Sequence, residues 1–183
     1  MSDDEDERYQ VRDPREGRAG KALIINVLNK YTKKYREGSK RDVKKMKEVF
    51  EHLNLEVEKT QSDDPTAQQI KDEVIRFREK IKSEYKGREK DFDMISVCLM
   101  GHGQEGIIFG SDFGKVDLRT DVFKAFSNEN CDVLSGKPRL FFMQACRGEE
   151  TDSGIDSQST LNGQVSFMHF TLQLKIIFRD IYI

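Results

Sequence analysis

The sequence predicts an α/β protein in which helices cover both faces of a mostly parallel central sheet. Short apolar runs typical of buried strands alternate with segments whose apolar residues recur at every third or fourth position. This order of strand, helix, strand and helix implies parallel strands joined by right-handed crossovers. The chain has 183 residues, which is enough for one domain with a single sizeable core.

The first half of the chain supplies two strands, each followed by a helix. Residues 22–26, a continuous apolar run that ends at Asn26, predict a central strand. After a basic loop, apolar residues on one face of 43–53 predict a helix with its lysines in water. Residues 55–58 alternate between apolar and polar and predict a second strand. The sequence Asp-Asp-Pro-Thr at 63–66 then caps a helix that ends near 85–87.

Two further buried strands each lead into residues that can do chemistry. Residues 94–100 are apolar and run into Gly-His-Gly, which contains His102. Residues 140–143 are apolar and run into Gln-Ala-Cys-Arg-Gly, which contains Cys146. Between them, the pattern predicts a small hairpin at 106–117 and then a helix carrying Val122, Phe123 and Phe126. Because open α/β sheets bind ligands at the carboxyl ends of their strands, His102 and Cys146 are expected over one crevice.

The two ends of the chain differ from the middle in composition. Residues 1–20 begin with an acidic block that has no hydrophobe to anchor it, and we expect them to be disordered. Residues 21–148 form the expected folded domain. Small and acidic residues at 149–164 are typical of a linker. Residues 165–183 form an apolar tail whose spacing fits a strand and a helix equally well, so both remain open.

Composition limits the partners and the compartment. Lys and Arg number 31 against 33 Asp and Glu, a net charge of −2, so no overall positive field predicts binding to nucleic acid or to a membrane. Three cysteines without a Cys-x-x-Cys pair, and apolar runs far below the ~18 residues of a membrane span, favour a reduced, soluble protein of the cytoplasm, with the nucleus as an alternative. One histidine and one cysteine lack a third ligand for zinc, so neither a metal nor a cofactor is expected.

A cysteine and a histidine at one sheet edge have the composition of an acyl-transfer site. The thiolate attacks a peptide carbonyl, and the imidazole handles the proton that the leaving amine needs. The backbone N–H groups of Gly103 and Cys146 are natural donors for the oxyanion, a contribution of ~3–4 kcal/mol per donor. Taken singly, Cys146 could instead be a small buried hydrophobe and His102 a turn residue, as we take His52 and His169 to be.

Several separated motifs agree with one another. The pentapeptide at 144–148 has the form Gln-Ala-Cys-Arg-Gly, and His102 precedes Cys146 by 44 residues. Further matching segments are 36–39 with Asp42, 103–110 and 134–141. Together these residues resemble the caspases, the aspartate-specific cysteine endopeptidases, and in particular the executioner caspases. The resemblance covers residues 21–156, which correspond to the family's large subunit, and it implies a three-layer, caspase-like sandwich.

The resemblance also implies a function and a set of site residues. The protein would be a cysteine endopeptidase that cuts protein substrates after aspartate in apoptotic proteolysis. His102 would be the general acid-base and Cys146 the nucleophile, with the amides of Gly103 and Cys146 forming the oxyanion hole. Arg36 and Gln144 match the residues that line the primary specificity pocket, where a guanidinium and an amide hold the substrate carboxylate. Without the motif, Arg36 in a basic loop would be interpreted as a solvated charge.

Two aspartates after the nucleophile motif point to control by cleavage. Asp152 precedes Ser-Gly and Asp156 precedes Ser, in a segment whose composition predicts mobility. Caspase precursors are cut at such linkers. We therefore expect a zymogen that is cleaved after Asp152 or Asp156, by itself or by another caspase; an ordinary acidic loop is the alternative.

The sequence departs from the family after this linker. Caspases have a small subunit there, whereas only 25 residues follow Gln158, the chain has no tryptophan, and 165–183 does not resemble that subunit. The expected fold is therefore a truncated caspase-like sandwich with an incomplete substrate groove. Two hypotheses follow. One is an endopeptidase completed by a caspase small subunit or by another caspase chain in a dimer; the other is a catalytically incomplete fragment or isoform that binds and regulates a full-length caspase.

Overall fold

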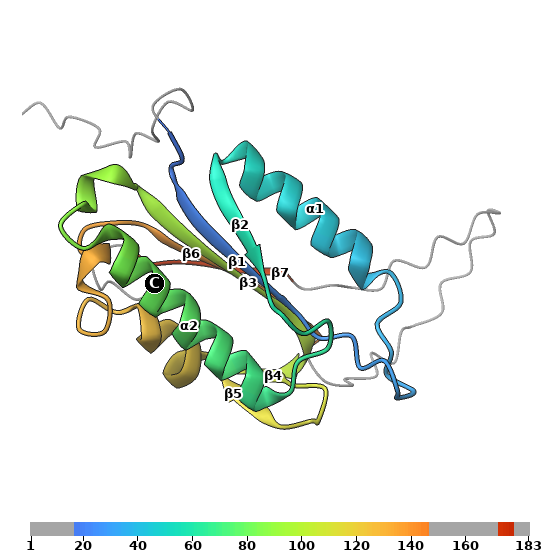
Figure 1. Ribbon diagram of the computed structural model, residues 1–183. Coiled ribbons are helices and arrows are strands. Elements are labelled where there is room, and N and C mark those ends of the chain that lie inside the picture. The colour runs from blue at the N-terminus through green and yellow to red at the C-terminus, as the bar shows by residue number, and fades with distance from the viewer. Residues whose placement is uncertain (1–16, 147–171, 178–183) are drawn as a thin grey trace, which may run out of the picture.

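The main sheet has parallel strands at its centre. The computed structural model describes residues 17–146 and 172–177, with Cys146 and the last segment described through their backbone. Four strands run parallel, and a fifth pairs antiparallel with the last of them (Figure 1). In spatial order they are β2 (Leu55–Lys59), β1 (Gly20–Asn26), β3 (Met94–Gln104), β6 (Arg139–Cys146) and β7 (Leu172–Ile177).

Two long helices cover the sheet. Helix α1 (Ser39–His52) connects β1 to β2, and α2 (Ala67–Tyr85) connects β2 to β3. Figure 1 shows them on opposite sides of the sheet, as the crossover order requires. Helix α2 begins with a capping box, in which the Thr66 side chain accepts the N–H of Gln69 while the Gln69 side chain accepts the N–H of Thr66. Of the expected cap residues 63–66, Thr66 is therefore the one that caps α2.

The core consists of two layers, one on each face of the sheet. Alternate residues of a strand point to opposite faces, so Leu23 of β1 packs with α2 whereas Ile24 packs with α1. On the α2 side, Ile70, Val74, Phe77 and Ile81 of the helix are fully buried against the sheet. On the α1 side, the ring of Phe50 meets that of Phe142 edge to face, with 5.4 Å between the ring centroids.

A hairpin and short helical turns follow β3. Strands β4 (Ile107–Phe109) and β5 (Lys115–Asp117) form the expected hairpin, which pairs with the end of β3. The helix expected after it is irregular: a π-helix, η3 (Leu118–Phe123), continues into the 3-10 turn η4 (Lys124–Phe126). Two further 3-10 turns are η2 (Glu89–Asp91) and η5 (Asp132–Leu134). Val122 and Phe126 are nevertheless buried in the α2 layer of the core, as the apolar spacing predicts.

The α/β class with parallel strands and helices on both faces is confirmed. The sequence left the apolar tail open between strand and helix, and the structure makes Leu172–Ile177 a strand because its backbone pairs with β6. The N-terminal segment 1–20, which we expect to be disordered, lies mainly outside the described residues. The expected linker at 149–164 lies wholly outside them. Neither α1 nor α2, nor any shorter helix in the described ranges, is long and apolar enough to cross a membrane.

Candidate active site

The pairing of β3 with β6 brings the expected acid-base and nucleophile to the same level of the sheet. The two strands are adjacent and parallel, and His102 is the register partner of Cys146. Neighbouring strands lie about 4.8 Å apart, so the two backbones are in close proximity. Cys146 is the last residue of β6. Both residues therefore lie at the carboxyl edge of the sheet, where the sequence analysis expected them.

His102 lies within β3, which continues past the glycines on either side of it. The strand ends at Gln104, and Gly103 is the register partner of Ile108 in β4. A Cβ atom at Gly103 would collide with the carbonyl oxygen of Ile107 and would lie 2.9 Å from the Cβ of Ala145. A glycine is required here because β4 and β6 both approach the strand closely. The oxyanion role of the Gly103 and Cys146 amides stays a prediction.

The ring of His102 is held by a backbone carbonyl. Its Nε2 lies 2.6 Å from the carbonyl oxygen of Lys34, in the loop between β1 and α1. A carbonyl oxygen accepts hydrogen bonds and cannot donate them, so the hydrogen of this bond belongs to Nε2. In the neutral ring, Nδ1 is then the acceptor. This arrangement leaves Nδ1 as the ring atom that can receive a proton from a nucleophile.

Arg36 is buried, which contradicts the interpretation of a lone cation in a basic loop as a solvated charge. The residue is 9% exposed. Its Nη1 donates to the carbonyl oxygen of Val27 and to the side-chain oxygen of Asn26, both at 3.0 Å, and to Ser39 Oγ at 3.3 Å. Its Nη2 donates to Oε1 of Gln144 at 3.5 Å. The structure thus brings together the two residues that the resemblance assigns to one pocket.

Gln144 occupies the central position in this group. It lies two residues before Cys146 on β6, and its Nε2 donates to Oδ2 of Asp42 at 3.5 Å while its Oε1 accepts from Arg36. Asp42 belongs to the first turn of α1. The amide therefore links a buried cation to a carboxylate, close to the strand end that carries Cys146. These partners fix its orientation.

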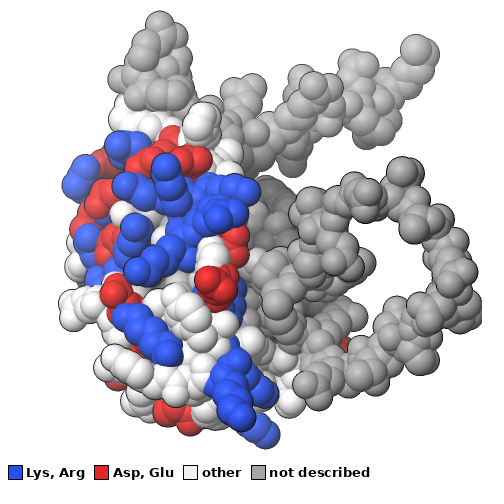
Figure 2. Space-filling model, turned by 90° about the vertical axis from the view of Figure 1, so that its right-hand side faces the viewer, with Lys and Arg blue, Asp and Glu red and all other residues white. Residues whose placement is uncertain are grey.

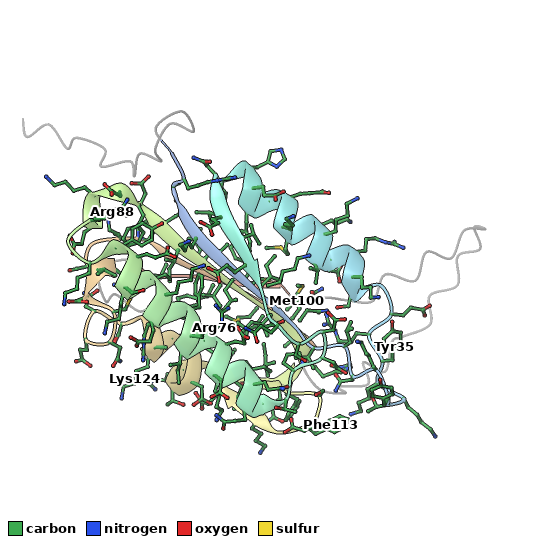
Figure 3. All side chains as sticks on the ribbon, in the orientation of Figure 1. Tyr35, Arg76, Arg88, Met100, Phe113 and Lys124 are labelled. Atoms are coloured by element: carbon green, nitrogen blue, oxygen red, sulfur yellow. The ribbon has the colours of Figure 1, made fainter. Side chains whose placement is uncertain are left out.

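Cations surround this end of the sheet. Figure 2 shows the molecule from the right-hand side of Figure 1, and Lys and Arg side chains cover much of the described part of this face. Lys33 and Lys34 of the loop and Lys40 and Arg41 of α1 are exposed, and no ion pair links any of them to a carboxylate within the described ranges. The loop is marked in Figure 3 by Tyr35, at the same end of the sheet as Phe113 in the β4–β5 turn. The local field is therefore positive although the net charge of the chain is slightly negative.

The cysteines at 98 and 131 differ from Cys146 in position. Both are buried, Cys98 in the α1 layer of the core and Cys131 in the α2 layer. Burial raises the pKa of Cys98 to about 12 and that of Cys131 to about 11. A thiol with so high a pKa is a poor nucleophile at neutral pH. Burial therefore makes Cys98 and Cys131 poor candidates for the nucleophile that the sequence assigns to Cys146.

The remaining histidines and the two expected cleavage sites either lie away from this site or fall outside the described residues. His52 is on α1, where its Nδ1 lies 2.7 Å from the carbonyl oxygen of Glu48 in the preceding turn. His169, Asp152 and Asp156 lie outside the described residues. In residues 17–146 and 172–177, no group of three or more His, Cys, Asp and Glu side chains is placed to bind a metal ion.

Sequence reasoning missed the residues that hold Arg36 and its loop in place. Asn26 was expected only as the end of a strand, yet its Oδ1 accepts from both Arg36 and Ser39. Asp64 was expected to cap α2, but its carboxylate accepts three backbone N–H groups of the loop that leads to Arg36. The signal that could have drawn attention to Asn26 is its position as a polar residue at the end of an apolar strand. Nothing in the local sequence identifies the backbone N–H groups that Asp64 binds.

Comparison with known proteins identifies the family. A family model described as the caspase domain matches residues 19–174. Human caspase-14 is 37% identical over 150 residues, which cover 82% of this chain and 55% of that protein. Chicken caspase-2 is 36% identical over 142 residues (76% of this chain, 31% of that protein), and cat caspase-3 is 31% identical over 163 residues (87% and 54%).

The chain belongs to the caspase family. This confirms the resemblance drawn from the sequence motifs, and the matched span agrees with the large-subunit region that they indicated. The fold is accordingly an α/β caspase-like sandwich. The chain spans about half the length of the caspase-14 and caspase-3 relatives that it matches, 55% and 54% respectively.

Proposed function

We propose that the protein is a cysteine endopeptidase of the executioner-caspase type, which cleaves protein substrates after aspartate in apoptotic proteolysis. The single observation that carries the proposal is the register pairing of His102 with Cys146 beside the contact between Arg36 and Gln144. One pair supplies the acid-base and the nucleophile, and the other supplies the recognition of a carboxylate. Membership of the caspase family supports the same reaction class.

The proposed chemistry uses the ring orientation of His102. With Nε2–H bonded to the carbonyl of Lys34, Nδ1 accepts the thiol proton of Cys146. The thiolate attacks the peptide carbonyl, and the N–H groups of Gly103 and Cys146 stabilise the oxyanion. The imidazolium then protonates the leaving amine as the C–N bond breaks. Water, deprotonated by the same ring, hydrolyses the thioester and restores the thiol.

Aspartate specificity follows from the second pair. The guanidinium of Arg36 is held by three neutral oxygens and by Gln144, so its plane is fixed before substrate arrives. A fixed guanidinium binds a carboxylate through two parallel N–H groups, and the Gln144 amide adds a third donor. The exposed cations of the loop and α1 attract acidic segments of a substrate to this edge. A substrate side chain without a carboxylate would offer this guanidinium no bidentate acceptor.

The partners proposed for the chain follow from its span. Because it matches about half of its relatives' length, the substrate groove would be completed by a caspase small subunit or by another caspase chain in a dimer. We place this assembly in the cytoplasm, with the nucleus as the alternative. Cleavage after Asp152 or Asp156 would convert a zymogen into the active form. Neither nucleic acid nor membrane is needed for this function.

A second candidate function is regulation of another caspase. In this alternative the chain is a catalytically incomplete fragment or isoform that binds a full-length caspase. The observation that favours it is again the share of the relatives' length that the chain covers. The pairing of β7 along six residues of β6 also supports it, because that pairing occupies the edge of β6 where a further strand would join.

One experiment separates the two candidates. Purified full-length chain is incubated with a fluorogenic aspartyl peptide and with the matching asparaginyl peptide, with Cys146→Ala as the control, and its mass in solution is measured alongside. Cleavage that requires both Cys146 and the aspartyl side chain supports the endopeptidase. No cleavage by the folded chain, together with loss of activity when it is mixed with a full-length caspase, supports the regulatory fragment.

A further inference from the structure

Three consecutive backbone N–H groups converge on one carboxylate beside the candidate site. Oδ1 of Asp64 accepts from Leu28 at 2.8 Å and from Asn29 at 2.9 Å, and Oδ2 accepts from Lys30 at 2.9 Å. Asn29 has a φ of 53°, a left-handed conformation that asparagine adopts more readily than most residues. Successive N–H groups that turn toward one point form a binding site for an anion. Here the anion is a side chain of the same protein.

The carboxylate is itself fixed in place. The N–H of Asp64 donates to Ser62 Oγ at 3.2 Å, and its carbonyl oxygen accepts from Ser111 Oγ at 2.9 Å. The N–H of Ser111 donates to the carbonyl oxygen of Pro65, also at 2.9 Å. Two residues after Asp64, Thr66 starts α2 with its capping box. Asp64 is therefore held between the start of a long helix and the β4–β5 turn.

The loop that Asp64 holds closes on itself at Arg36. The carbonyl oxygen of Leu28 accepts the backbone N–H of Arg36 at 2.9 Å, so Leu28 is bonded to Asp64 on one side and to Arg36 on the other. Within the loop, the carbonyl oxygen of Asn29 accepts both the N–H and the hydroxyl of Thr32, at 3.1 and 3.0 Å. These bonds make residues 28–36 a compact unit whose position depends on its attachment.

The same loop carries the carbonyl that orients His102. Lys34 lies between Leu28 and Arg36 in this unit, and its carbonyl oxygen accepts from Nε2 of His102 at 2.6 Å. A shift of the loop would therefore move the acceptor of the acid-base and the pocket arginine together. The carboxylate of Asp64 is the attachment of the loop on the α2 side.

We propose that Asp64 is a positioning residue for both His102 and Arg36, acting through the backbone of residues 28–36. Its effect on turnover rests on the proposed function, but its hold on the loop can be measured without any substrate. The neighbouring residue offers a matched control. Asp63 is exposed, and among the described residues its carboxylate meets Lys30 Nζ at 3.5 Å, with no backbone N–H bonded to it.

The first test measures amide hydrogen exchange by NMR on the full 183-residue chain. In the wild type, the amides of residues 28–30 should be protected although they lie in a loop. Asp64→Asn should raise their exchange rates by ~10-fold or more, because hydrogen bonds to a charged acceptor are lost. Asp63→Asn removes the same charge one residue away and should leave these rates unchanged. Unprotected amides in the wild type, or equal rates in both variants, would overturn the proposal.

The second test separates positioning from a purely structural role. The Nε2 proton of His102 should give an NMR signal that Asp64→Asn broadens or shifts and Asp63→Asn leaves in place. A purely structural role would lower the melting temperature without changing this signal. Release of the amides of residues 28–30 with an unchanged His102 signal would therefore overturn the positioning role.

The third readout links the loop to turnover. With an aspartyl peptide, Asp64→Asn should lower kcat through His102 and raise KM through Arg36, for a fall in kcat/KM of ~10-fold or more. Unchanged kinetics with a released loop would overturn the positioning role. If the wild type shows no turnover that depends on Cys146, the proposed function fails, and the exchange and ring signals still decide the role of Asp64. If Asp64→Asn does not fold, Asp64→Glu, which displaces the carboxylate by one methylene, should speed exchange at the same three amides.

Discussion

Nη2 of Arg36 lies 3.5 Å from Oε1 of Gln144, although the two residues are 108 positions apart in the sequence. Arg36 comes from the loop between β1 and α1, and Gln144 comes from β6, two residues before Cys146. The contact joins the expected recognition of the substrate carboxylate to the strand that carries the expected nucleophile. The expected binding residues and the expected nucleophile therefore meet at one strand end.

Replacing Arg36 by lysine tests the recognition of aspartate. Arg36→Lys keeps the positive charge but loses the planar fork that bonds Val27, Asn26 and Gln144. We expect kcat/KM for an aspartyl peptide to fall by ~100-fold, since charge-assisted hydrogen bonds contribute about 1.5–3 kcal/mol each. Arg41→Lys, an exposed change on α1, is the control and should keep kcat/KM within about a factor of two. Normal kinetics in Arg36→Lys would exclude Arg36 from the pocket.

The three cysteines should differ in reactivity in the native chain. Because burial raises the pKa of Cys98 to about 12, only ~1 in 30,000 of its thiols is ionised at about pH 7.5, and Cys131, at about 11, is similarly inert. We expect iodoacetamide to modify Cys146 alone, as read by peptide mass mapping. The same reagent in urea should label all three cysteines. Labelling of Cys98 at the rate of Cys146 in the folded chain would contradict this assignment.

Glu58 should make stability depend on pH in acid. Burial acts to raise its pKa, but the ion pair with Lys80 at 2.8 Å and the hydrogen bond from Arg76 at 3.2 Å outweigh burial and lower the pKa below its ordinary value of 4.5. A pKa that is lower in the folded state stabilises the fold above the unfolded pKa, and this contribution disappears as the pH falls through the folded pKa. Glu58→Gln should therefore cost about 1–2 kcal/mol of unfolding free energy at neutral pH, with both cations partly exposed.

Urea unfolding across an acid series measures this effect. The difference between wild type and Glu58→Gln should shrink as the pH falls below 4.5, the ordinary pKa of the group. Glu48→Gln, which disrupts an exposed pair with Lys44 at 4.0 Å, is the control and should change stability little at any pH. A penalty in Glu58→Gln that is constant from neutral to acid pH would rule out linkage through this carboxyl.

Cleavage of the linker should leave the C-terminal strand in place. β7 pairs with β6 at six residue pairs, from Arg139 with Ile177 to Gln144 with Leu172. A cut after Asp152 or Asp156 lies between these strands in the sequence, so we expect both pieces to elute together in native size exclusion and to separate only in denaturant. The double variant Asp152→Ala, Asp156→Ala should stay intact. Nicking of that variant at the same place would refute these sites, and separate elution would refute the association.

Local sequence patterns determine most of the framework. Apolar spacings of three and four predict that α1 and α2 each bury one face, and right-handed crossovers between parallel strands then place the two helices on opposite faces of the sheet. The order of strands then brings His102 and Cys146 to one edge, since parallel neighbours end on the same side. The motifs around these two residues also identified the caspase family, which the comparison confirms.

Tertiary structure alone decides the conformation of the tail at 172–177 and the burial and attachment of the loop that carries Arg36. The tail at Leu172–Ile177 fits a helix and a strand equally well by periodicity, and only pairing with the edge of β6 selects the strand. Arg36 is typical of a solvated charge by its neighbours, but oxygens from β1 and β6 make its burial favourable. The carboxylate of Asp64 holds backbone N–H groups 34 to 36 residues away. Backbone N–H groups are common to nearly all residues, so no local pattern can specify which of them a distant carboxylate will bind.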